Sequence, residues 1–109
     1  MNELITVVQN NFGYDLDFTC KDSAGVVVNL TGSTLTFTYQ NLADGSINST
    51  GNMVIVGSPT LGTCKYTVQN TDFTVAGSYS AQINVNYGSG TEIITFPGIN
   101  INVVPKLPQ

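Results

Sequence analysis

The sequence predicts an all-β protein, folded as an antiparallel β-sandwich of about seven to nine strands. Apolar and polar residues alternate along several short stretches, as expected for strands with one buried and one solvated face. Turn-forming residues interrupt these stretches roughly every ten residues, which is the turn spacing of a sandwich or barrel. Only 9% of the 109 residues are charged, and the scarcity of Lys, Glu, Arg and Gln argues against helices.

Strands are expected where every second residue is apolar. The longest such stretches are 14–21, 33–40 and 78–87, and each would place its apolar side chains on one face of a sheet. Shorter strands are expected at 4–8, 26–28, 53–56, 63–68, 92–96 and 99–103. The residues expected to point inward are Leu16, Phe18, Cys20, Leu35, Phe37, Tyr39, Cys64, Tyr66, Val68, Tyr79, Ala81, Ile83, Val85, Tyr87, Ile99, Ile101 and Val103.

Three segments have features of their own. The polar segment 41–52 is expected to be a long loop that could hold one short hairpin. Segment 70–76 is expected to be irregular, with a helical turn after Asp72 as an option. Pro97 is expected to mark a break or a bulge, because proline cannot donate to a β-ladder.

Length and composition predict one domain. A chain of 109 residues can bury a single core without metal or disulfide staples. We expect the domain to cover residues 1–104 and a tail with two prolines, 105–109, to leave its body. The segment 1–8 lacks a basic start and a long apolar run, so neither a signal peptide nor a membrane span is expected.

The charge distribution argues against nucleic acid and membrane as partners. The net charge is −4, and the basic residues are Lys21, Lys65 and Lys106. Three lysines that are far apart in sequence do not easily form the cation cluster that phosphates require. Attraction to anionic lipid is disfavoured for the same reason.

The sequence offers no catalytic apparatus. It contains no His, which excludes His-based triads and His metal ligands, and no serine lies in a nucleophile-elbow motif. Asp15 and Asp17 share a strand face about 7 Å apart, which would suit glycosidase-like chemistry or calcium. We favour solvent-facing charges that keep the strand soluble and oppose edge pairing. The protein is therefore expected not to be an enzyme, and no catalytic, cofactor-binding or metal-binding residue is assigned.

Five short motifs occur along the chain in a characteristic order. They are DSAG (22–25), VNLTGSTL (28–35), GTCKY (62–66), TD with AGSY (71–79) and TFP (95–97). With these motifs the chain resembles the N-terminal immunoglobulin-like domain of phage baseplate upper proteins, and related small immunoglobulin-like proteins of tailed phages, over nearly its whole length. The resemblance implies an immunoglobulin-like form of the predicted sandwich.

The same resemblance implies a structural component of a bacteriophage virion, such as a tail or baseplate adaptor, that acts by protein–protein docking. Its partners would be other virion proteins in a multi-copy assembly, and it would be made in the host bacterial cytoplasm. Capsid decoration or a head-fibre role is an alternative place in the particle. In each case the protein would be part of the virion.

A carbohydrate- or receptor-binding module is an alternative function. It would need exposed aromatic side chains, and Phe12, Tyr14 and Phe73 lie near expected turns, while the loop 41–52 is the best candidate surface. We favour the interpretation that these aromatic residues cap the ends of the sandwich.

Three further side chains are interpreted through the resemblance. In an immunoglobulin-like order, Cys20 and Cys64 would lie on the second and fifth strands, which neighbour each other in one sheet. A disulfide there could contribute roughly 4 kcal/mol, but we favour two buried free thiols because no secretion signal is visible. Tyr79, with Asp72 and Gly77, resembles a tyrosine corner, in which the phenol binds a backbone group at the start of a strand.

Overall fold

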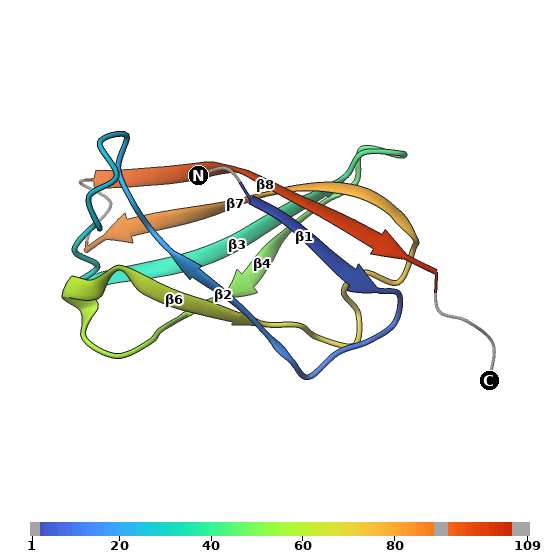
Figure 1. The fold of residues 1–109 in the computed structure, drawn as a ribbon, viewed down its shortest axis with the longest axis horizontal. Coiled ribbons are helices and arrows are strands. Elements are labelled where there is room, and N and C mark those ends of the chain that lie inside the picture. The colour runs from blue at the N-terminus through green and yellow to red at the C-terminus, as the bar shows by residue number, and fades with distance from the viewer. Residues whose placement is uncertain (1–2, 89–91, 106–109) are drawn as a thin grey trace.

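Two β-sheets packed face to face form the structure (Figure 1). The computed structural model of the chain describes residues 3–88 and 92–105, apart from the side chains of residues 49, 50, 92 and 93. The larger sheet contains, in spatial order, β1 (Glu3–Val8), β8 (Glu92–Val104), β7 (Gly77–Tyr87), β3 (Ser33–Asn41) and β4 (Ile47–Asn52). The smaller sheet contains β2 (Asp15–Thr19), β6 (Thr63–Thr67) and β5 (Val54–Ile55). The prediction of an all-β sandwich is confirmed, and the eight strands of the described ranges fall within the expected number.

One strand pair differs in direction from the prediction. β1 pairs with β8 in parallel, from Glu3 opposite Ile99 to Val8 opposite Val104. The other strand pairs in the described ranges are antiparallel. Nearly the whole domain separates β1 from β8 along the chain, so no hairpin fixes their relative direction. The expected antiparallel sandwich is therefore corrected to a mixed sheet packed on an antiparallel one.

The segment expected to be a long loop contains a full strand. β4 pairs with β3, and Asn41 N–H donates to Ser46 O at 2.9 Å across the turn between them. The pattern of alternation is hidden here because Gly51 is a buried residue of β4. A Cβ on Gly51 would lie 2.8 Å from Cε1 of Tyr66, so a ring from the opposite sheet fills the space that an apolar side chain would occupy.

Two other expected elements differ in detail. Residues 26–28 form no strand, and only an isolated bridge joins Lys21 to Val27. Segment 70–76 is irregular as expected and contains no helical turn, whereas a short 3-10 helix, η1, forms at Pro59–Leu61.

The irregularity predicted at Pro97 is present in the structure. β8 runs through Pro97, and its register against β7 shifts between Ala81 and Ile83. The expected irregularity is therefore a bulge inside one long strand. The predicted tail, 105–109, lies outside the described residues except for Pro105.

The hydrophobic core lies between the two sheets. Phe37 of β3 stacks on Tyr66 of β6 with ring centroids 4.8 Å apart, and on Phe18 of β2 at 5.7 Å. Such ring pairs add to the stabilisation that burial provides. Every residue predicted to point inward is buried except Tyr87, which is partly buried.

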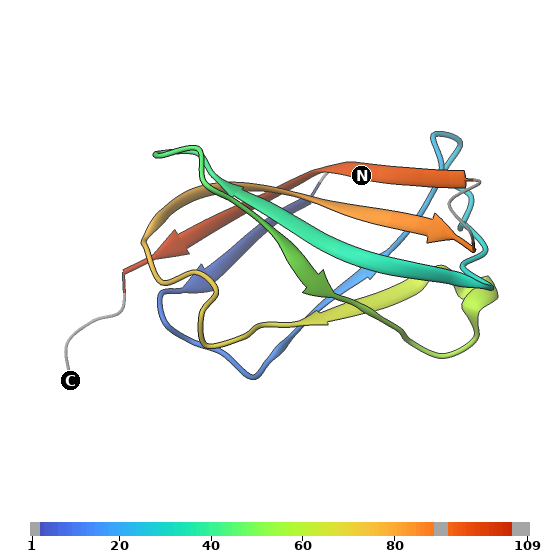
Figure 2. The same cartoon turned by 180° about the vertical axis from the view of Figure 1, so that it is seen from behind.

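The two flanks of the sandwich differ. On one flank only Met53 separates β4 from β5, so the chain crosses there from one sheet to the other (Figure 2). On the other flank, β1 is the last strand of the larger sheet and β2 is the last strand of the smaller one. A pocket of the described surface lies beside these two edges.

Candidate functional site

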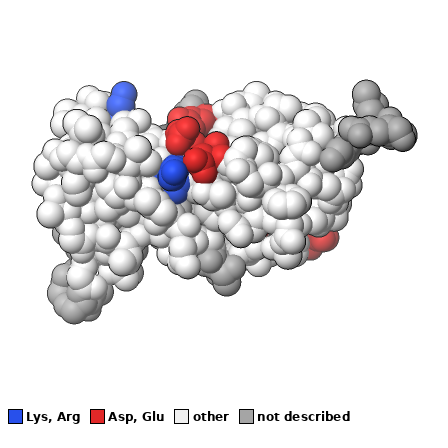
Figure 3. Space-filling model, turned by 90° about the horizontal axis from the view of Figure 1, so that it is seen from below, with Lys and Arg blue, Asp and Glu red and all other residues white. Residues whose placement is uncertain are grey.

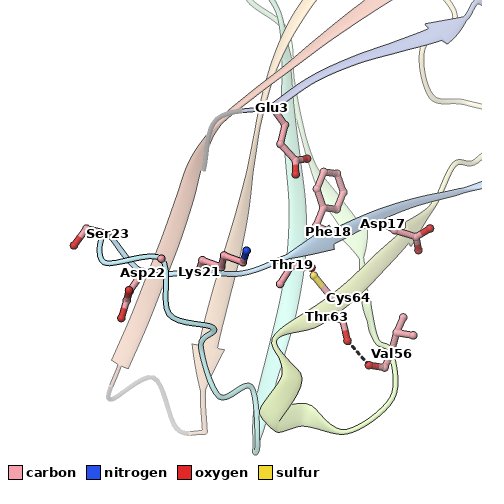
Figure 4. Close-up of a pocket in the computed structure, with 11 residues that line it drawn as sticks. Glu3, Asp17, Phe18, Thr19, Lys21, Asp22, Ser23, Val56, Thr63 and Cys64 are labelled. Carbon is pink, nitrogen blue, oxygen red and sulfur yellow. Dashed lines mark hydrogen bonds between the residues drawn. The ribbon is translucent and has the colours of Figure 1, made fainter.

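A pocket of about 840 Å³ lies along β2, on the flank where β1 and β2 are the edge strands. Figure 4 shows Glu3, at the start of β1, extending toward Phe18 on β2. Phe18 and Cys64 line its floor, and Val56, which is 40% exposed, contributes an apolar wall. The pocket is therefore built from strands of both sheets and has an apolar base.

The edge of β2 carries backbone groups without a strand partner. Tyr14 O accepts a hydrogen bond of 2.9 Å from the chain after β6, and Cys20 N–H donates one of 2.8 Å to the chain before it. Backbone groups alternate in direction along a strand, so those of the odd-numbered residues Asp15, Asp17 and Thr19 point away from β6. No described strand pairs with this edge.

Acidic side chains dominate the rim of the pocket. Glu3, Asp17 and Asp22 line it together with a single cation, Lys21. None of these three acids forms an ion pair within the described part of the chain. Figure 3 shows acidic groups gathered beside a basic group, on a face with few other charges. The rim is thus a negatively charged region on a surface with few other charges.

Asp15 and Asp17 have different surroundings although they share a strand face. Asp15 accepts a hydrogen bond from Thr67 Oγ1 at 2.6 Å and forms an ion pair with Lys65 Nζ at 3.3 Å. These contacts, with Thr67 as the larger cause, lower the pKa of Asp15. Asp17 has no hydrogen bond or ion pair among the described residues, and both side chains are exposed. The two carboxylates therefore do not converge on one reacting centre.

Cys20 and Cys64 are free thiols beneath this pocket. Their Sγ atoms lie 3.9 Å apart, and both side chains are buried. This arrangement agrees with the favoured interpretation of two neighbouring free thiols. The hydrogen bond with Cys20, together with burial, raises the pKa of the Cys64 thiol, which keeps it protonated and weakly nucleophilic at neutral pH.

A second polar cluster lies inside the sandwich, and the sequence analysis did not find it. Asp72 accepts a hydrogen bond of 2.6 Å from Tyr39 Oη and another from Tyr66 Oη. Gln69 N–H donates to the same carboxylate at 2.9 Å, and Asn48 Nδ2 donates to Tyr39 Oη at 3.0 Å. Burial, followed by the contact with the carboxylate, raises the pKa of both tyrosines.

The sequence contains only an unspecific indication of this cluster, namely two tyrosines on inward faces. Tyr39 and Tyr66 were expected on inward faces, where a phenol needs a hydrogen-bond partner. Asp72 was assigned to the tyrosine corner instead. The sequence does not indicate that Tyr39, Tyr66 and Asp72 are in contact, because they lie on β3, on β6 and in an irregular loop.

The tyrosine corner itself is confirmed. Tyr79 Oη donates to Val75 O at 2.8 Å at the start of β7. Among the three aromatic residues near expected turns, Phe73 is fully buried and Tyr14 packs partly buried against the core, whereas Phe12 is exposed. These three residues do not form an exposed aromatic platform.

No group of three or more His, Cys, Asp or Glu side chains among the described residues could hold a metal ion. The described part of the chain also contains no helix that is long and apolar enough to cross a membrane.

The fold and the edge pocket together define an immunoglobulin-like β-sandwich domain with an exposed strand edge. Residues 4–108 match the family described as the BppU N-terminal domain. The chain therefore belongs to the family of baseplate upper protein N-terminal domains, as its sequence motifs indicated. Membership of this family indicates a structural protein of the phage baseplate and thus a component of the virion.

Similarity to other known proteins is distant. No curated protein matches the chain. Among solved structures, the chain is similar to a family 123 glycoside hydrolase from Clostridium perfringens, with 11% sequence identity and a TM-score of 0.38. The similarity covers 98% of this chain and 23% of the hydrolase, so the chain spans about a quarter of that protein's length.

Proposed function

We propose that the protein is a docking module of the phage baseplate or tail, which binds other virion proteins by protein–protein contact and is present in several copies per particle. The family match over residues 4–108 carries this proposal. Two features support it: only 9% of the residues of the chain are charged, and the edge of β2 has no described strand partner. An open sheet edge is suited to docking on a larger scaffold.

The module is proposed to work by binding alone, without catalysis. The sequence has no His. Asp15 is bound by Thr67 and Lys65, whereas Asp17 has no such contact among the described residues. The buried Asp72 already accepts hydrogen bonds from two phenols and an N–H. Nucleic acid and anionic membranes are not expected as partners, because the net charge is −4 with three lysines.

Mass spectrometry and cryo-electron microscopy of purified particles test this function. We expect the chain among the particle proteins, with density for its sandwich at the tail end. Density on the head would instead support capsid decoration or a head-fibre role. Absence of the chain from purified particles would overturn the proposal.

A further inference from the structure

We propose that the edge of β2 is the docking site, and that it binds an extended segment of another virion protein in which lysine alternates with small or apolar residues. This inference rests on the proposed function and assigns a binding site to it. The segment would join the smaller sheet as an additional strand beside β2, which is a common way for a sheet to bind an extended peptide.

The backbone of β2 provides the first argument. Its odd-numbered residues, Asp15, Asp17 and Thr19, direct their N–H and C=O groups away from β6. These groups repeat at the spacing of a β-ladder, and no described strand uses them. An incoming strand could therefore form main-chain hydrogen bonds without displacing any existing pair.

The hollow beside this edge provides the second argument. The pocket of about 840 Å³ includes, on the side of the open edge, Glu3 at the start of β1 and the buried Phe18 of β2. Alternate side chains of an added strand would point to this side. The apolar base formed by Phe18 favours small or apolar side chains at those positions.

The negative charge on the rim of the pocket favours a partner segment that contains lysine. Glu3 and Asp17 come from different sheets, line the same pocket and have no ion-pair partner in the described ranges. Asp15, by contrast, is already paired with Lys65. Asp17 and Phe18 point to opposite faces of β2, and Glu3 extends toward Phe18, so two separate lysines of the incoming segment would pair with the two carboxylates.

The same charges disfavour a second copy of this chain at the edge. Antiparallel pairing of β2 with β2 would bring the aspartates of one copy opposite those of the other, and like charges directly opposite each other destabilise a strand pair. The net charge of −4 adds repulsion between copies. A basic partner segment avoids both costs.

Carbodiimide cross-linking of purified particles, read by mass spectrometry, tests this site. This reagent joins a carboxylate directly to a neighbouring amine, so we expect Glu3 or Asp17 to be linked to a lysine of a different virion protein. Hydrogen–deuterium exchange should also be slower across residues 15–19 in the particle than in the free chain, because new main-chain hydrogen bonds protect the amides.

Variants separate the contribution of charge from that of the backbone. The double variant Glu3→Gln with Asp17→Asn should reduce incorporation into particles by roughly fivefold, as expected for the loss of two exposed ion pairs. Thr19→Pro removes an edge N–H and no charge, and it should also reduce incorporation. Asp44→Asn, on the turn between β3 and β4, is the control and should incorporate normally. Melting curves of the free variants identify any loss of folding.

Failure of this inference differs from failure of the proposed function. If the chain is present in particles but residues 15–19 exchange as fast as in the free chain, the edge is not the docking site. Cross-links from Glu3 or Asp17 only to a second copy of this chain would likewise overturn it, as would normal incorporation of the double variant. Absence of the chain from particles would overturn the function and the site together.

Discussion

Asp72 illustrates how much a single buried residue can organise at the residue scale. Its side chain is 2% exposed, yet it accepts hydrogen bonds from a tyrosine of each sheet. A buried carboxylate is costly unless its lone pairs are satisfied, and here two phenols and the Gln69 N–H satisfy them. The carboxylate therefore ties the two sheets together at one end of the core.

Replacing Asp72 tests how much these hydrogen bonds between the sheets stabilise the protein. Asp72→Asn should lower the free energy of unfolding by about 1–3 kcal/mol, because the amide NH₂ cannot accept a hydrogen bond and one phenol loses its buried partner. Urea denaturation measures the change. Asp17→Asn is the matched control, since Asp17 is exposed and has no hydrogen bond in the described residues, and it should change stability by less than about 0.5 kcal/mol. Equal effects of the two variants would contradict the assigned role.

The two thiols give a second prediction at this scale. Cys20 and Cys64 are buried and free, and the pKa of Cys64 is raised, so we expect neither to react with a maleimide reagent while the protein is folded. Both should react after denaturation under non-reducing conditions, which mass spectrometry counts as two added labels. A denatured protein that takes up no label would show a disulfide instead.

At the scale of elements, the segment around η1 depends on a close approach of three stretches of chain. Gly62 follows η1 with a φ of 70°, and a Cβ there would lie 2.9 Å from Cys20 O and 3.0 Å from Val28 O. This contact is where the 26–30 segment lies against the end of β2. Only glycine combines the left-handed backbone with this spacing.

Gly62→Ala should therefore destabilise the protein by about 2–4 kcal/mol, the sum of left-handed strain and a forced shift of backbone atoms. Gly57→Ala is a well-matched control, because Gly57 has a φ of 71° while the nearest atom to its Cβ would be Leu61 Cδ1 at 3.8 Å. It should cost only about 1–2 kcal/mol. Thermal or urea unfolding of the two variants measures the difference, and equal losses would exclude the close approach as the cause.

Elements with clear alternation were predictable, and the others were not. β2, β3 and β7 lie where apolar residues alternate, because their inner faces carry large side chains. β4 was missed because its buried position is Gly51, under the ring of Tyr66. The residues at 26–28 look like a strand because all three are valine, but they lie beyond the end of β2 and form only one bridge.

The candidate site was less predictable than the fold, for a physical reason. The sequence pattern identifies Asp17 only as a neighbour of Asp15 on one strand, and no pattern distinguishes Glu3. They line the same pocket because the sandwich brings the edges of two sheets together. Periodicity assigns residues to a face of a strand, but it does not say which edges of different sheets become neighbours.

At the scale of the whole molecule, the buried tyrosines predict how stability depends on pH. Burial is the largest cause that raises the pKa of Tyr39, Tyr66, Tyr14 and Tyr79. Tyrosines of the unfolded chain ionise near pH 10, whereas these remain protonated in the fold. The folded state then binds more protons, so stability decreases as pH rises.

The tyrosines should thus leave the free energy of unfolding unchanged up to about pH 9 and decrease it above about pH 10. Urea denaturation across this range, followed by circular dichroism, measures the effect. Tyr66→Phe removes one of these groups and should make the alkaline decrease shallower, although it lowers stability at neutral pH. A variant with the same alkaline slope as the wild type would contradict the contribution of Tyr66.

The parallel pairing of β1 with β8 has a mechanical consequence. The first residue of β1 and the last residue of β8 lie at opposite ends of the paired stretch, which includes six registered pairs. Tension applied between residues 3 and 104 would pull the two strands past each other and load all six pairs together, instead of peeling them apart one at a time. A domain arranged in this way should resist stretching between these two residues more than a domain whose end strands peel apart.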